Sequence, residues 1–121
     1  MYKLIAVDMD GTLLNDKSEL TEKTIETVKK LIEKGGIFTI STGRPVQGLK
    51  TVIEKLDLKG PMITYNGAIL AMAEDSRIIF HKKLEETDAK MILDMGLRLN
   101  TTIVVWSNNR LYVNVINDRV N

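Results

Sequence analysis

The sequence predicts an α/β fold with a mainly parallel, three-layer sheet, followed by a smaller α+β unit. Three observations predict it. Short apolar runs alternate with longer amphipathic segments, glycine and proline separate these segments, and closely spaced short strands replace the alternation after Asn66–Gly67. A strand–helix–strand–helix–strand order is typical of a right-handed, mainly parallel sheet, because consecutive parallel strands need a helical crossover between them.

The first strand and the first helix are expected at residues 4–7 and 22–34. The run at residues 4–7 is continuously apolar, which is typical of a strand buried on both faces. Thr21 is the expected N-cap of the helix, and Gly35–Gly36 ends it. One face of this helix is apolar and is formed by Ile25, Val28, Leu31 and Ile32.

The second and third strands are expected at residues 37–41 and 62–65. Between them, Pro45 is well placed in the first turn of a helix, because its ring fixes a helical φ and it lacks an N–H. Gly60–Pro61 then breaks the chain before the third strand. The apolar positions of this second helix are Val46, Leu49, Val52, Ile53 and Leu56.

The pattern after Asn66–Gly67 changes to α+β with antiparallel strands, since this dipeptide is a strong hairpin signal. We place the boundary between the two units at residues 83 and 84. The elements expected here are strands at 68–72, 77–82, 102–106 and 111–115, a helix at 88–98 capped by Thr87, and a turn at 107–109.

The composition excludes several classes of protein. The 121 residues include 17 Lys and Arg against 16 Asp and Glu, and no cysteine. The near-neutral charge argues against a nucleic-acid partner, and the lack of cysteine excludes disulfides, thiolate metal sites and cysteine nucleophiles. No apolar run reaches the roughly 20 residues that span a membrane. Because Asp8 comes too early for a signal peptide, we expect a cytoplasmic globular protein without a membrane partner.

Polar clusters follow each of the first three predicted strands. In an open α/β sheet, ligands bind outside the carboxyl ends of the strands. If the three strands lie side by side, these clusters share one crevice. The clusters are Asp8-Met9-Asp10-Gly11-Thr12, Thr42-Gly43-Arg44 and Asn66-Gly67.

The residue types in these clusters suit phosphoryl transfer. Two carboxylates at Asp8 and Asp10 repel each other when held close, which favours binding of a divalent cation. Gly11 permits a sharp turn that lets successive N–H groups cradle an anion. Thr42 adds a hydroxyl donor, and Arg44 adds a positive charge. Carboxylates, a metal and an anion cradle can together stabilise the charge on a transferring phosphoryl group.

The ordered motifs resemble those of the haloacid dehalogenase superfamily of phosphohydrolases. Asp8-Met9-Asp10-Gly11-Thr12-Leu13-Leu14 is similar to its first motif, and Ser41-Thr42-Gly43-Arg44 is similar to its second. Asn66-Gly67-Ala68, followed by a hairpin and an α+β segment, resembles the Cof-like subfamily (IIB) with a type-two cap. The resemblance implies a partial Rossmann-like core at residues 1–83 and the beginning of an α+β cap at residues 84–121.

The resemblance also implies a role for each residue. Asp8 is expected to be the nucleophile and a Mg²⁺ ligand. Asp10 is expected to be the acid and base, and to ligate Mg²⁺ through its backbone carbonyl. The phosphate-binding and rim residues are then expected to be Met9, Gly11, Thr42, Gly43, Arg44 and Asn66. The implied substrate is a small phosphate monoester such as a sugar phosphate, hydrolysed through an aspartyl-phosphate.

The chain departs from the family in one respect. The family's third motif, a lysine on a later helix, and its fourth, a Gly-Asp strand end, are not found before Asn121. We therefore expect a truncated chain with little or no activity alone, and self-association through the uncovered core sheet. The alternatives are a phosphomutase of sugar phosphates and a catalytically dead or regulatory phospho-accepting fragment.

Overall fold

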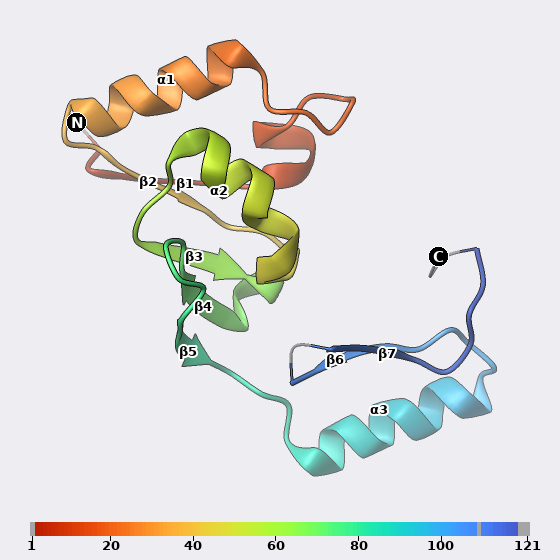
Figure 1. Ribbon diagram of the computed structural model, residues 1–121. Helices are drawn as coiled ribbons and strands as arrows, with labels where there is room; N and C mark the ends of the chain where they lie inside the picture. The colour runs from red at the N-terminus through yellow and green to blue at the C-terminus, as the bar shows by residue number, and fades with distance from the viewer. Residues whose placement is uncertain (1, 109, 119–121) are drawn as a thin grey trace. The chain divides into compact units, whose positions relative to one another are not determined.

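The computed structural model describes residues 2–108 and 110–118. The chain divides into two compact units, Met1–Lys82 and Lys83–Asn121 (Figure 1). The assignment of these units as a catalytic core and a cap stays a prediction. Within the part of the chain that the structure describes, no helix has the length and apolar character that a bilayer crossing requires.

The first three strands of the first unit run parallel. β1 (Leu4–Val7) pairs in register with β2 (Ile37–Ile40). β3 (Pro61–Thr64) joins β2 through one parallel bridge between Ser41 and Ile63. The carboxyl ends of all three strands therefore lie at one edge. This arrangement confirms the predicted α/β class with its parallel centre.

β3 also belongs to an adjoining antiparallel sheet. β4 (Ile69–Met72) and β5 (Ile78–His81) follow in the order β3-β4-β5. The turn between β3 and β4 holds Tyr65 at φ +50° and Asn66 at φ +55°, in the left-handed region. Asparagine tolerates this conformation better than most residues, which explains why the Asn66–Gly67 signal predicted the hairpin correctly.

The two helices of the first unit differ in how well the sequence predicted them. α1 (Glu22–Glu33) begins as expected after Thr21, whose side chain accepts a hydrogen bond from the Thr24 backbone N–H at 3.2 Å. The prediction of one helix from Pro45 is wrong: a single 3₁₀ turn precedes α2 (Lys50–Leu56). Pro45 is extended, and the N–H of Gly48 donates to its carbonyl oxygen at 3.0 Å. Glycine at position 48 disfavours a regular helical turn.

The apolar core lies where α1 and α2 pack against each other and α1 against β2. Its most completely buried side chains are Met9, Ile40, Leu49, Leu56 and Met62. The prediction that residues 4–7 are buried on both faces is wrong, because Leu4 is 55% exposed and Ile5 is 37% exposed. Among the described residues β1 pairs with β2 alone, so its other edge is uncovered.

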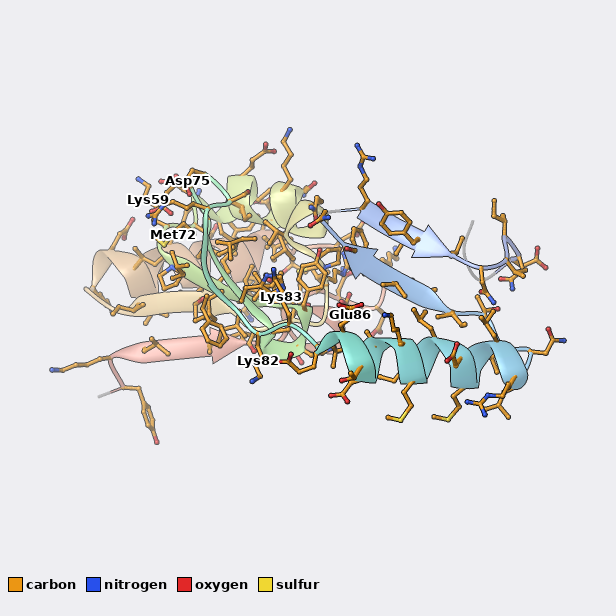
Figure 2. All side chains as sticks on the ribbon, turned by 90° about the horizontal axis from the view of Figure 1, so that it is seen from below. Lys59, Met72, Asp75, Lys82, Lys83 and Glu86 are labelled. Carbon is orange, nitrogen blue, oxygen red and sulfur yellow. The ribbon has the colours of Figure 1, made fainter. Side chains whose placement is uncertain are left out.

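The described residues of the second unit form one helix and one hairpin. Its elements are α3 (Glu86–Arg98), β6 (Val104–Ser107) and β7 (Arg110–Val113), with the two strands antiparallel. α3 begins before the expected Thr87 cap, because Glu85 is the extended residue that precedes it. The acidic Glu86 in its first turn favours this start. The turn expected at residues 107–109 includes Asn109, which lies outside the described residues. Figure 2 shows Lys82 and Lys83 in the connection that leads to Glu86.

Candidate active site

The first two strands bring their polar loops to neighbouring positions. The backbone N–H of Ser41 donates to the carbonyl oxygen of Val7 at 2.9 Å. The next residue along each strand is a predicted site residue, Asp8 after β1 and Thr42 after β2. Both therefore leave the sheet at the same edge, as expected from parallel strands.

The first loop folds back on itself directly after Asp8. The backbone N–H of Leu13 donates to the Asp8 carbonyl oxygen at 3.1 Å. Gly11 has φ +73°, and a Cβ built there would meet no atom within 4 Å, so conformation rather than space favours glycine. This geometry confirms the predicted sharp turn. The side chain of Met9 is fully buried and anchors the loop, whereas those of Asp8 and Asp10 are exposed. Met9 can therefore offer a ligand only its backbone.

The second loop is organised by the buried side chain of Thr42, which is 4% exposed. Its Oγ1 accepts a hydrogen bond from the backbone N–H of Arg44 at 3.1 Å. A hydroxyl that accepts this bond keeps its own hydrogen to donate. Thr42 thus shapes the second loop, and its hydroxyl can still donate a hydrogen bond.

The third loop is joined to the second. The backbone N–H of Asn66 donates to the Thr42 carbonyl oxygen at 3.1 Å, and that of Tyr65 donates to the Arg44 carbonyl oxygen at 3.2 Å. A Cβ built on Gly43 would lie 2.8 Å from Oδ1 of Asn66. The two loops approach so closely that a side chain at position 43 would displace that of Asn66.

An ion pair links the first loop to the second. Nε of Arg44 donates to Oδ2 of Asp10 at 2.8 Å, and Nη2 donates to Oδ1 at 2.6 Å. The hydrogen bond to Asp10 raises the pKa of the Arg44 guanidinium, and desolvation opposes this rise. Arg44 was expected at the rim of the site, and the sequence did not indicate its pairing with the predicted acid. The only available signal was the opposite charge of two adjacent strand ends.

The donor atoms at this edge are of the kinds that Mg²⁺ takes. Mg²⁺ is usually held by one or two carboxylates and completes its shell with water and substrate phosphate. The Asp8 carboxylate and the Asp10 backbone carbonyl fit this pattern, whereas both carboxylate oxygens of Asp10 accept bonds from Arg44. Among the described residues, no group of three or more His, Cys, Asp or Glu side chains could hold a metal. These atoms are therefore of the types that bind Mg²⁺, but the described residues supply too few of them to complete the ligand set.

Comparisons with known proteins find relatives over most of the chain. A family model described as haloacid dehalogenase-like hydrolase matches residues 5–121. YxeH of Bacillus subtilis is 35% identical over 115 residues, which cover 93% of this chain and 43% of YxeH. The 5-amino-6-(5-phospho-D-ribitylamino)uracil phosphatase YitU of the same organism is 34% identical over 98 residues, which cover 80% of this chain and 36% of YitU.

A solved structure shares the fold over nearly the whole chain. The haloacid dehalogenase-like hydrolase from B. subtilis superposes with a TM-score of 0.86 and 28% sequence identity. The match covers 98% of this chain and 41% of that protein. The chain thus spans less than half the length of the relatives and of the structure that it matches.

Proposed function

Because the chain belongs to the haloacid dehalogenase-like hydrolases, we propose that it is part of a phosphohydrolase that forms an aspartyl-phosphate. The family predicted from the motifs is confirmed by the match over residues 5–121. The observation that carries the proposal is the meeting of three loops at one sheet edge, where Asp8 and Thr42 follow a hydrogen-bonded pair of strand residues and Asp10 is bonded to Arg44.

The proposed reaction has two steps. An Asp8 carboxylate oxygen attacks phosphorus, the bond from phosphorus to the ester oxygen breaks, and Asp10 gives that oxygen a proton. Water then attacks phosphorus while Asp10 takes its proton, and the bond to Asp8 breaks to release phosphate. The hydroxyl of Thr42 and the backbone N–H groups of Gly43 and the first loop hold the phosphoryl oxygens.

The proposed cofactor is Mg²⁺. The Asp8 carboxylate and the Asp10 backbone carbonyl would hold the ion, and water and substrate phosphate would complete its shell. When bound, it would supply positive charge that offsets the negative charge of the phosphoryl oxygens and of Asp8.

The proposed substrates are small phosphate monoesters such as sugar phosphates. YitU, by its name, acts on a phosphorylated ribityl compound, which supports this size and chemistry. A cytoplasmic location stays a prediction of the sequence.

An Asp8→Asn variant tests the nucleophile in the full-length protein. We expect loss of phosphate release from 4-nitrophenyl phosphate with Mg²⁺, because an amide cannot form the acyl phosphate. The 121-residue chain alone is expected to turn over the ester poorly, because its described residues offer an incomplete set of Mg²⁺ ligands. Release of free phosphate supports a hydrolase, whereas isomerisation of a sugar phosphate would indicate a mutase.

Asp75→Asn is the matched control. Asp75 lies in the turn between β4 and β5 (Figure 2). Because Met72 at the end of β4 pairs with Pro61 at the start of β3, this turn lies at the sheet end opposite the site. The control should keep normal turnover. Normal turnover by Asp8→Asn would instead remove Asp8 from the nucleophile role and with it the proposed function.

A further inference from the structure

The ion pair between Arg44 and Asp10 differs from the other ion pairs among the described residues. Those others join residues two or four positions apart, as in Asp75 with Arg77 and Glu86 with Lys90. Arg44 and Asp10 are 34 positions apart and belong to different loops. Exposed local pairs contribute little to stability, whereas a two-pronged guanidinium–carboxylate pair fixes the orientation of both groups.

Arg44 is itself held in place. Its backbone N–H donates to Thr42 Oγ1 at 3.1 Å, and its carbonyl oxygen accepts from the Tyr65 N–H at 3.2 Å. Its side chain is 38% exposed, against 52% for Asp10. The loop that carries Asp10 is also anchored, because the backbone N–H of Leu14 donates to the Met9 carbonyl oxygen at 3.0 Å and the Met9 side chain is fully buried. Two anchored loops therefore meet at this pair, and its two-pronged geometry fixes the Asp10 carboxyl group against the Arg44 guanidinium.

The pairing leaves Asp10 able to react. Each carboxylate oxygen has two lone-pair directions, and Arg44 uses one on each oxygen. The remaining directions are available to a leaving-group oxygen or a water molecule. A guanidinium whose Nε and Nη2 are committed in this way has less to offer the substrate phosphate directly.

We propose that Arg44 is a positioning residue that holds the Asp10 carboxyl group where, in its protonated form, it can give a proton to the leaving group. This inference rests on the proposed function. It predicts that the effect of removing Arg44 depends on the leaving group. An ester whose alcohol leaves readily as an anion needs little protonation, whereas a poor leaving group depends on a correctly placed acid.

A series of substituted phenyl phosphates, from 4-nitrophenyl to unsubstituted phenyl, tests this in the full-length protein with Mg²⁺. The parameter to compare is kcat/KM, which includes departure of the leaving group. We expect Arg44→Ala to lower it by about 10²-fold for phenyl phosphate and by less than about 5-fold for 4-nitrophenyl phosphate. Asp10→Asn should likewise lower kcat/KM more for phenyl phosphate than for 4-nitrophenyl phosphate. The double variant Asp10→Asn/Arg44→Ala should show no larger difference between the two esters than Asp10→Asn alone.

Two variants make the result specific. Arg44→Lys keeps a positive charge but not the planar fork, so it should restore only part of the phenyl phosphate activity. Arg44→Lys also replaces Arg44→Ala as the test variant if circular dichroism shows that Arg44→Ala does not fold. Arg77→Ala removes the exposed partner of Asp75 at the opposite sheet end and should leave the whole series unchanged.

The outcomes separate this inference from the proposed function. An equal loss across the series in Arg44→Ala would mean that Arg44 binds the phosphate of the substrate, and no loss would mean that it has no role. Either result overturns the positioning inference while a dead Asp8→Asn variant still supports the hydrolase. An active Asp8→Asn variant overturns the proposed function itself.

Discussion

Gly43 and Asn66 occupy the closest contact between two loops of the candidate site. A Cβ at position 43 would lie 2.8 Å from Asn66 Oδ1, which is nearer than real Cβ atoms approach other atoms. We expect Gly43→Ala to lower the free energy of unfolding by about 1 kcal/mol in urea denaturation, because the exposed Asn66 side chain must move aside. Phosphatase activity should fall as well, since the Gly43 N–H would be displaced.

Two variants check that this contact is the cause. Adding Asn66→Gly to Gly43→Ala removes the obstructing side chain, and glycine accepts the φ of +55° at position 66. This double variant should regain most of the lost stability. Gly48→Ala is the matched control, because its Cβ would meet Arg44 at an ordinary 3.8 Å. If the double variant is no more stable than Gly43→Ala, the contact is not the source of the loss.

The placement of single residues was predictable where it depended on strand ends. Asp8 and Thr42 each follow an apolar strand, and parallel pairing then places them at one edge. The pairing of Asp10 with Arg44 was not predictable in this way, because it depends on the course of two loops after their strands have ended. The chemical roles of all these residues stay predictions.

The N-terminus of α1 offers a test at the scale of one element. Thr21 Oγ1 accepts a hydrogen bond from the Thr24 N–H, which would otherwise have no partner within the helix. We expect Thr21→Ala to lower the free energy of unfolding by about 1 kcal/mol, measured by urea denaturation. Thr27→Ala on the same helix is the control. Its hydroxyl bonds back to the Lys23 carbonyl oxygen, so its loss should change stability little. Equal effects of both variants would contradict the capping role.

The elements were predicted best where several local signals agreed. α1 has a capping threonine, an apolar face and a terminal glycine, and its predicted start matches the structure. Only one signal, Pro45, marked the start of α2, and Gly48 weakened the helical tendency after it. Strand β1 was misjudged for a different reason. An apolar run shows that a strand suits burial, but which strands cover it depends on the rest of the sheet.

The uncovered edge of β1 leads to a prediction for the whole molecule. Among the described residues this edge has no strand partner, and Leu4 beside it is 55% exposed. Unpaired N–H and C=O groups next to apolar side chains favour pairing with a second chain. β5 is an edge strand of the adjoining sheet β3-β4-β5. Its pairing with a second chain is opposed by a register irregularity where it meets β4 and by the two lysines directly after it (Figure 2).

We therefore propose that the 121-residue chain self-associates through β1. Sedimentation velocity should show a weight-average mass that rises with protein concentration, and Leu4→Lys should reduce this rise because a charged edge residue opposes strand addition. Ile79→Lys, which places the same charge on β5, is the matched control and should leave the association unchanged. A rise that Ile79→Lys abolishes and Leu4→Lys does not would move the contact to β5. A monomer at all concentrations would show that exposed apolar residues of β1 are not enough to join two chains.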